Sequence, residues 1–211
     1  MNIIVIPARG GSKGLPRKNL KILDGLPLVV RAALISREAW NVDDVFVSTE
    51  DAEIKAVCHA YGVDVLDRPA GLATDEASTD AVIEHALNNL ACDVLGLVQC
   101  TAPLMMTADV EQVIELVEKG ADSAFAACKW HGFLWAADGS GINHDGKKRL
   151  RRQDAPVEYL EAGSVYAVNP KIFKQEKTRF CGRPVIVEVD RARVFEIDDA
   201  TDFEIVERLI T

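Results

Sequence analysis

Residues 7–20 read PARGGSKGLPRKNL and follow directly on a short apolar run, Ile3 to Ile6, that is typical of a buried strand. The stretch places three glycines among four cations: Gly10, Gly11 and Gly14, with Arg9, Lys13, Arg17 and Lys18. Glycine lets backbone N–H groups approach an anion closely, and ligands of open α/β sheets bind beyond the carboxyl ends of the strands. The stretch therefore predicts a site for a phosphate-rich ligand at the end of a first strand.

The spacing in this basic stretch excludes two common phosphate motifs. A P-loop needs G-x-x-x-x-G-K-[ST], whereas Lys13 lies between Ser12 and Gly14. In a dinucleotide fingerprint, G-x-G-x-x-G, the first glycine would fall at Arg9. Residues 1–23 carry five cations and no anion, although the whole chain has a net charge of −9. A solvated turn with surface lysines is the alternative, but so local a concentration of positive charge favours an anion site.

Length and composition fit one domain that spans residues 1–211. The chain is 48% hydrophobic and 27% charged, and a chain of this size buries about 70% of its unfolded surface. The acidic balance argues against nucleic acid or an anionic membrane as the main partner, and no apolar run approaches the ~20 residues of a membrane span. The N-terminus runs straight into a strand, so we expect no signal peptide. The five cysteines form no C-x-x-C pair, which favours reduced thiols in a cytoplasmic protein over a disulfide framework or a zinc site.

Apolar runs and amphipathic stretches alternate along most of the chain. We expect helices over 28–36 and 51–61, and two more that are capped by Thr79 and Thr107. Strands are expected over 44–49, 63–66, 94–98 and 123–128. This rhythm predicts an α/β fold with a doubly wound, mostly parallel, Rossmann-like sheet and right-handed crossovers.

The alternation of predicted strands and helices stops at Lys129. Residues 129–160 contain Trp130, Phe133 and Trp135, a turn-rich segment and the basic run 147–152. The aromatic residues fit an ordinary core or an oligomer interface equally well, since interfaces are enriched in them. We interpret this segment as an excursion from the sheet that serves dimerisation. The chain then returns with short strands and a closing helix, at 163–168, 184–189, 194–197 and 201–210.

The run Glu196-Ile197-Asp198-Asp199 is a second concentrated signal. Two carboxylates at i and i+2 on a strand point to the same face, and Mg²⁺ prefers oxygen ligands. The alternative is a solvated strand end that caps the last helix. The basic stretch near the N-terminus favours the metal, because nucleotidyl transfer uses both cations and Mg²⁺ to spread charge.

Five motifs resemble those of the cytidylyltransferases that activate acidic sugars, especially the acylneuraminate (CMP-sialic acid) synthetases. They are PARGGSKGLPRKN, VSTED, RPAGLATDEAST, QCTAP and RRQDAPVEYLEAGSVY, and they extend over nearly the whole chain. The resemblance implies a nucleotidyltransferase that joins CMP from CTP to a 2-keto-3-deoxy acid sugar and releases pyrophosphate. It also implies Mg²⁺ as cofactor and a homodimer. Lys13-Gly14 and Arg17-Lys18-Asn19 favour the acylneuraminate branch over the related CMP-KDO synthetases.

The resemblance implies roles for individual residues. Catalysis is expected from Arg9, Lys18 and Asp198, and metal binding from Glu196 and Asp198. The nucleotide is expected to contact Ala8, Arg9, Gly10, Gly11, Ser12, Lys13, Lys18, Asn19, Arg68, Ala77, Ser78 and Thr79. The sugar is expected to contact Gln99, Thr101, Arg152, Gln153 and Tyr166, partly across the dimer.

Three positions depart from the family pattern, and the last two of them leave the identity of the sugar open. Glu196 replaces the first metal aspartate, Met105 a common arginine and Ala162 a common asparagine. The alternatives are KDO or an 8-amino analogue, a different nucleoside triphosphate, and a non-catalytic nucleotide-binding module that a pyrophosphate-release assay separates from an enzyme. A nucleic-acid binder built on residues 147–152 conflicts with the acidic chain.

Overall fold

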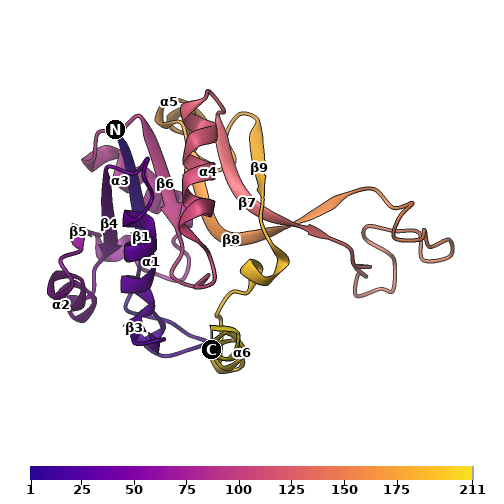
Figure 1. The fold of residues 1–211 in the computed structure, drawn as a ribbon, viewed down its shortest axis with the longest axis horizontal. Helices are drawn as coiled ribbons and strands as arrows, with labels where there is room; N and C mark the ends of the chain where they lie inside the picture. The colour runs from indigo at the N-terminus through magenta and orange to yellow at the C-terminus, as the bar shows by residue number, and fades with distance from the viewer. Residues whose placement is uncertain (211) are drawn as a thin grey trace.

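The computed structural model describes residues 1–210, in which one seven-stranded mixed sheet has helices on both faces (Figure 1). The strands of this sheet are β1 (Asn2–Pro7), β4 (Asp44–Thr49), β5 (Asp64–Asp67), β6 (Val94–Val98), β7 (Ser123–Trp130), β8 (Glu158–Val168) and β9 (Pro184–Glu188). Their order is β5-β4-β1-β6-β8-β7-β9. β8 is antiparallel to both its neighbours, and all other pairs are parallel. The prediction of a mostly parallel, doubly wound sheet is confirmed.

Helices connect most of the strands, as the alternation in the sequence predicts. They are α1 (Leu28–Arg37), α2 (Ala52–Ala60), α3 (Thr79–Asn89), α4 (Thr107–Glu118), α5 (Pro170–Glu176) and α6 (Ala200–Ile210). Short 3₁₀ turns and a small hairpin complete the fold: η1 (Lys18–Leu20), η2 (Ala70–Leu72), η3 (Arg191–Val194), β2 (Ile22–Leu23) and β3 (Leu26–Pro27). None of the helices within residues 1–210 combines the length and the apolar character needed to cross a membrane.

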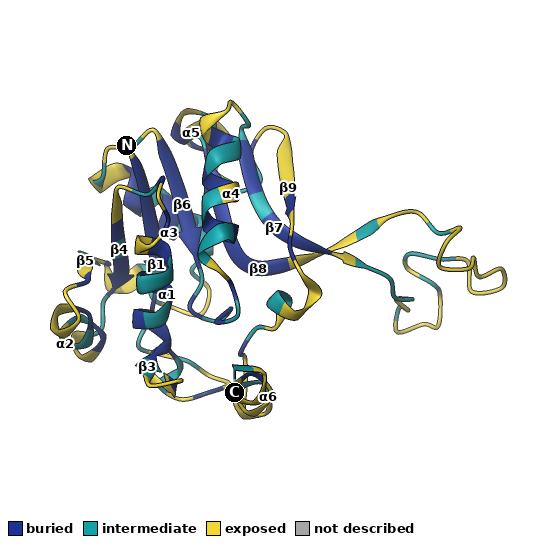
Figure 2. Ribbon diagram, viewed as in Figure 1, coloured by how far each residue is buried: buried dark blue, intermediate teal, exposed yellow. Residues whose placement is uncertain are grey.

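The central strand β1 is buried on both faces, which explains its unbroken apolar sequence (Figure 2). Ile4 and Ile6 belong to the core that includes α1, α2 and α4. Ile3 and Val5 point the other way, into a second core with α3 and α5. The order of the strands reverses beside β1, because β4 lies on one side of it and β6 on the other. The loops after β1 and β6 therefore meet at the crevice where ligands of such sheets bind.

The excursion is a twisted ribbon that projects away from the body of the molecule (Figure 1). β7 and β8 form its stem, and residues 131–157 join them at its far end. Phe133 and Trp135 each pack against His144 there, and the Arg149 guanidinium lies 4.5 Å from the centre of the Phe133 ring. β8 begins at Glu158, so the return strand is longer than the predicted 163–168.

The predicted strand over 194–197 is wrong. Residues 191–194 instead form η3, where Asp190 accepts a hydrogen bond from the Ala192 amide. The Ile197 amide donates to the carbonyl oxygen of Thr101 at 2.7 Å, so this part of the chain is tied to a loop and not to a neighbouring strand. The argument that placed Glu196 and Asp198 on one face of a strand therefore does not hold.

Two predicted helix caps are also displaced by one residue. Ser78, and not Thr79, caps α3, because its hydroxyl oxygen accepts a hydrogen bond from the Ala81 amide at 3.1 Å. Thr107 is the first residue of α4, and its hydroxyl donates to the Ile35 carbonyl oxygen.

Candidate active site

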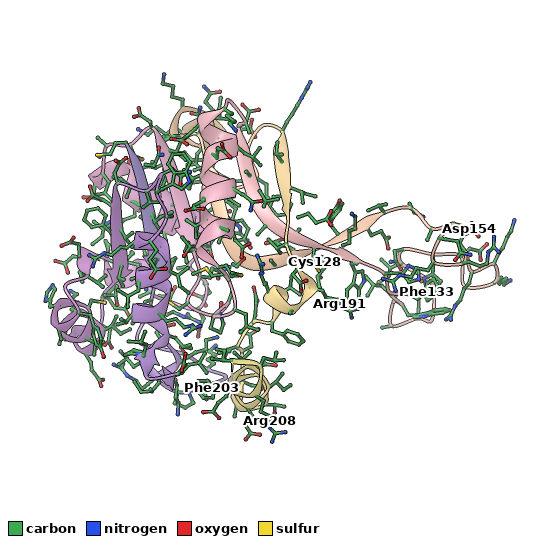
Figure 3. The ribbon with its side chains drawn as sticks, viewed as in Figure 1. Cys128, Phe133, Asp154, Arg191, Phe203 and Arg208 are labelled. Atoms are coloured by element: carbon green, nitrogen blue, oxygen red, sulfur yellow. The ribbon has the colours of Figure 1, made fainter. Side chains whose placement is uncertain are left out.

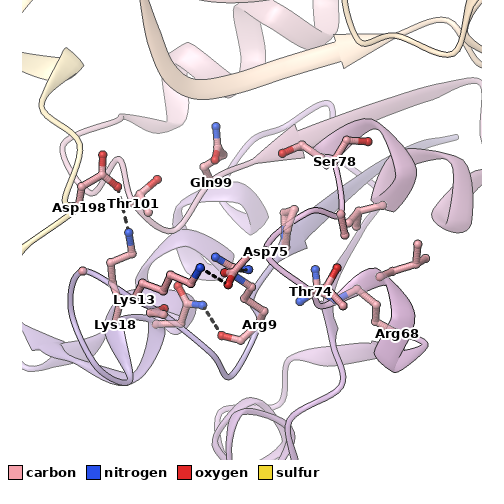
Figure 4. A pocket seen from close by; sticks show the side chains of 18 of the residues that line it. Arg9, Lys13, Lys18, Arg68, Thr74, Asp75, Ser78, Gln99, Thr101 and Asp198 are labelled. Carbon is pink, nitrogen blue, oxygen red and sulfur yellow. Dashed lines mark hydrogen bonds and ion pairs between the residues drawn. The ribbon is translucent and has the colours of Figure 1, made fainter.

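A cavity of about 510 Å³ opens at the carboxyl ends of β1 and β6 (Figure 4). Four segments form its walls: the basic loop 8–21 after β1, the polar loop 68–79 after β5, residues 99–101 after β6, and residues 195–199 before α6. Its charged lining residues are Arg9, Lys13, Lys18, Arg68, Asp75, Glu196 and Asp198. Residues of the basic stretch 7–20 and of the acidic run 196–199 therefore line the same cavity.

Arg9 and Lys13 converge on one carboxylate, that of Asp75 (Figure 4). Nη1 of Arg9 lies 2.8 Å from Oδ1 of Asp75, and Nζ of Lys13 lies 2.6 Å from Oδ2. Hydrogen bonds from Lys13 and then Arg9 are the main causes that lower the pKa of Asp75. Asp75 was not among the predicted site residues, although its loop was. The pair of cations is arranged as an anionic ligand requires.

Lys18 joins the basic loop to the acidic segment. Its Nζ donates to the Ile197 carbonyl oxygen at 2.7 Å and to Oδ1 of Asp198 at 3.1 Å. Gly14 lies directly beneath the same segment, and a Cβ at this position would be 2.2 Å from the Asp198 carbonyl oxygen. Only glycine permits this approach of the two backbones, so Gly14 serves packing as well as loop flexibility.

Glu196 and Asp198 both line the cavity despite the irregular backbone between them. Burial is the first cause that raises the pKa of Glu196, followed by the neighbouring carboxylates of Asp198 and Glu161. The Glu196 side chain occupies the space next to Gly163, where a Cβ would lie 1.1 Å from Oε1. Asp199 has a different role, because its Oδ1 accepts hydrogen bonds from the Thr201 and Asp202 amides at the start of α6.

The carboxylate pair fits a divalent cation only in part. Within residues 1–210, no cluster of three or more His, Cys, Asp or Glu side chains is arranged to hold a metal. Mg²⁺ is commonly bound by one or two carboxylates, with substrate phosphates and water as its other ligands. Glu196 and Asp198 match that pattern, and Lys18 offsets only part of the effect by which burial and the neighbouring carboxylates raise the pKa of Glu196.

Glu50 links the basic loop to Arg68. Its carboxylate accepts from the Gly10 amide at 2.8 Å and from Nη2 of Arg68 at 3.2 Å. Burial is the main cause that lowers the pKa of Arg68. Nε of Arg68 is buried and has no hydrogen-bond partner in the described part of the chain. A buried donor without an acceptor is costly, and this one belongs to a residue that lines the cavity.

Most of the predicted nucleotide contacts lie around this cavity. They are Arg9, Ser12, Lys13, Lys18, Asn19, Arg68, Ala77, Ser78 and Thr79. Ala8, Gly10 and Gly11 are not among its described lining residues. The amides of Ala8 and Gly10 already donate to Ser48 and Glu50. The Asn19 side-chain amide donates to the Arg9 carbonyl oxygen at 3.0 Å, so it positions the loop as well as lining the cavity.

The predicted sugar contacts are divided among three places. Gln99 and Thr101 line the first cavity. Tyr166 lines a neighbouring cavity of about 460 Å³ that shares Gln99 with the first. Arg152 and Gln153 lie in the projecting excursion, next to the labelled Asp154 in Figure 3, and line neither cavity of the described chain. Their role in sugar binding stays a prediction.

Arg17 differs from the other cations of the basic loop. Its guanidinium forms ion pairs with Asp51 at 2.7 Å and with Glu53 at 2.5 Å. Its backbone φ of 55° lies in the left-handed region, which favours glycine. Arg17 thus fixes the loop to the start of α2, and it is not among the described residues that line the cavity.

Known proteins share both the sequence and the fold of this chain. It is 33% identical to N-acylneuraminate cytidylyltransferase A of Danio rerio, over 98% of this chain and 50% of that protein. It is 29% identical to pseudaminic acid cytidylyltransferase of Campylobacter jejuni, over 96% of this chain and 93% of that protein. The chain spans about half the length of several other curated relatives named N-acylneuraminate cytidylyltransferase.

A solved structure and a family model complete the comparison. The structure of CMP:2-keto-3-deoxy-manno-octonic acid synthetase complexed with CTP has a TM-score of 0.77 at 18% identity, over 99% of this chain and 98% of that chain. At this identity the likeness concerns the fold alone. The family model described as cytidylyltransferase matches residues 3–209. With nearly its whole length matched by that model, the chain belongs to the cytidylyltransferase family.

Proposed function

We propose that this protein transfers CMP from CTP to a 2-keto-3-deoxy acid sugar of the sialic or nonulosonic acid class and releases pyrophosphate. One observation carries the proposal: a basic group and an acidic pair face each other across a single cavity at the switch point of the sheet. The names of the relatives, which include neuraminate and pseudaminate cytidylyltransferases, support this choice of nucleotide and sugar.

The triphosphate lies along the basic loop in this proposal. Arg9 and Lys13 bind its phosphates in place of Asp75, and Lys18 neutralises charge closer to Asp198. The cytosine base lies toward Arg68 and residues 77–79, which line the same cavity. A site built to bind the C4 amino group of cytosine rejects UTP strongly, because UTP leaves buried polar groups unpaired.

The chemistry follows from positioning and charge. The anomeric hydroxyl oxygen of the sugar bonds to the α-phosphorus while the bond from that phosphorus to the β-bridging oxygen breaks, so pyrophosphate leaves. No covalent protein intermediate is required. Burial raises the pKa of the nearby Cys100 thiol to about 12, which keeps it protonated and unsuited to nucleophilic attack.

We also propose Mg²⁺ as the cofactor. Glu196 and Asp198 would hold it, together with phosphate oxygens and water. When bound, the ion supplies positive charge next to the transferring phosphate. Asp198 already accepts a hydrogen bond from Lys18, so this lysine orients one of the two metal-binding carboxylates. Replacement of the shorter aspartate by Glu196 is accommodated because Gly163 leaves room for the longer side chain.

A homodimer in the cytoplasm completes the proposal. The excursion exposes a set of large apolar side chains: Leu134, Trp135, Ile142, Leu150 and Val157. Exposed apolar groups on a projecting arm are typical of an interface. A second copy seated there would also bring Arg152 toward a sugar cavity. All five cysteines are free, as a reducing compartment favours.

Pyrophosphate release tests the function. The protein is incubated with Mg²⁺, CTP and, separately, N-acetylneuraminic acid, pseudaminic acid and 2-keto-3-deoxy-manno-octonic acid. We expect release with at least one nine-carbon acid sugar, and much slower release when UTP replaces CTP. Binding of CTP without turnover on any of the three sugars would support the non-catalytic alternative.

A further inference from the structure

The second cavity lies beside the first cavity, which we propose binds the nucleotide and which is called the nucleotide cavity below. It is lined by Gln99, Leu160, Glu161, Gly163, Tyr166, Arg179, Val194 and Glu196. Gln99 and Glu196 also line the nucleotide cavity, so a group held in one is adjacent to a group held in the other. Among the described residues that line the second cavity, Arg179 carries the only positive side chain.

Arg179 is held in place from two sides. Its guanidinium carbon lies 5.0 Å from the ring centre of Tyr166 and 5.0 Å from that of Phe180. Oδ1 of Asp80, at the start of α3, lies 3.3 Å from Nη1 of Arg179 and also accepts from the Arg179 backbone amide at 3.2 Å. The guanidinium is therefore positioned before any ligand binds.

This arginine has unused hydrogen-bonding capacity. Its ion pair with Asp80 is long and engages one nitrogen. Nε is buried and has no acceptor among residues 1–210. A guanidinium offers five N–H donors in a planar fork that matches a carboxylate. The structure thus presents a fixed cation whose donors are only partly satisfied.

The rest of the cavity disfavours an anion. Glu161 accepts a hydrogen bond from the Tyr166 hydroxyl, and Glu196 faces it across the same space. The carboxylate of Asp198, which lines the first cavity together with Glu196, adds a further negative charge nearby. A substrate carboxylate entering here needs a cation of its own, because like charges repel strongly at low dielectric.

We propose that Arg179 is a specificity-determining residue that binds the carboxylate of the acid sugar. The inference rests on the proposed function, because it assumes that the second cavity holds the sugar while CTP fills the first. The rings of Tyr166 and Phe180 keep the guanidinium in place, and the sugar carboxylate shares it with Asp80. Arginine is suited to this task since charge-assisted pairs with carboxylates are strong and directional.

Kinetics of two neutralised variants test this inference. We expect Arg179→Gln to raise KM for the preferred acid sugar by about 10- to 100-fold, the range for loss of a hydrogen bond to a charged group. The KM for CTP should change by less than about twofold, because Arg179 does not line the nucleotide cavity. The matched control is Asp80→Asn, which removes the ion pair and keeps the arginine. Asp80→Asn should change the sugar KM by much less than Arg179→Gln does, because the rings of Tyr166 and Phe180 still contact the guanidinium.

The charge of the substrate provides a second readout. The wild-type protein should prefer the acid sugar to its C1 methyl ester, and Arg179→Gln should lose most of that preference. Arg179→Lys keeps the charge and should retain part of it, which covers the case in which the glutamine variant does not fold. The inference would be overturned if Arg179→Gln and Asp80→Asn raised the sugar KM equally, or if Arg179→Gln kept the wild-type preference for the acid over the ester. Arg179 would then have only a structural role, in which it stabilises the position of α3. Absence of pyrophosphate release by the wild-type protein would instead refute the proposed function itself.

Discussion

Replacing Asp51 by asparagine tests how the basic loop is fixed in place. Oδ2 and Oδ1 of Asp51 accept hydrogen bonds from Nη1 and Nη2 of Arg17 at 2.7 and 2.9 Å. The same carboxylate caps α2 by accepting from the Glu53 and Ile54 amides at 3.0 and 2.9 Å. Asparagine is an equally good cap. Asp51→Asn therefore removes the charge pair and keeps the helix start.

The pKa of Asp51 gives the size of the effect. Its value falls from 3.8 to about 2, and the hydrogen bond from Arg17 is the largest cause. One pKa unit corresponds to ~1.4 kcal/mol, so the interactions of the ionised carboxylate stabilise the fold by at most about 2 to 3 kcal/mol. Because the pKa is depressed in the folded protein, this stability is present above pH 3.8 and is lost as the pH falls toward 2. A loss of that size lowers the Tm by roughly 4–12 °C for a chain of this length.

Urea unfolding of the wild-type protein and of Asp51→Asn at pH 7, 5 and 3 measures this directly. The difference in the free energy of unfolding should be largest at pH 7 and pH 5 and should shrink at pH 3. Asp67→Asn is the control, because Asp67 forms an exposed ion pair with Lys55 and should contribute little. Equal stability of Asp51→Asn and the wild type at pH 7, or a difference that does not change with pH, would refute the role given to the Arg17–Asp51 pair.

Further predictions concern the cavity. Arg9→Ala should lower kcat/KM by about a hundredfold or more, since it removes a positioned charge from the transferring phosphates; an unchanged value would contradict its assignment. Asp198→Asn should reduce Mg²⁺-dependent turnover more than Glu196→Gln, and Asp199→Asn should be mild because asparagine still caps α6; Mg²⁺ titrations that rank Asp199→Asn worst would reverse the proposed ligands. Asp75→Asn should tighten pyrophosphate binding severalfold in calorimetry, because its two cation partners are released; weaker binding would mean that Asp75 itself contacts the ligand.

The sequence predicted the position of the site better than its internal contacts. Local patterns placed the basic loop at the end of β1, because an apolar run followed by glycines and cations depends only on neighbouring residues. Whether a cation faces the cavity or the scaffold is a tertiary question. Arg17 and Lys18 are adjacent, yet Arg17 pairs with Asp51 on α2 and Lys18 turns to Asp198.

Residues that no local motif marks were missed for the same reason. Asp75 lies in a loop that the sequence singled out, but only the fold brings its carboxylate to Arg9. Arg179 follows α5 in a turn without a recognisable pattern, and its contacts in the fold are with the distant residues Asp80 and Tyr166. The error at 194–197 has a similar origin, because the Ile197 amide bonds to Thr101 in a distant loop. Hydrophobic periodicity cannot detect such a contact.

The central claim is that one cavity joins CMP to an acid sugar. Its most direct test is to analyse the products of wild-type protein, Mg²⁺, CTP and the preferred acid sugar by mass spectrometry and ³¹P NMR, with Arg9→Ala alongside. We predict a CMP-sugar and pyrophosphate in equal amounts from the wild type, and about a hundredfold less of both from the variant. Formation of free CMP without a CMP-sugar, or the same yield from Arg9→Ala, would contradict the account.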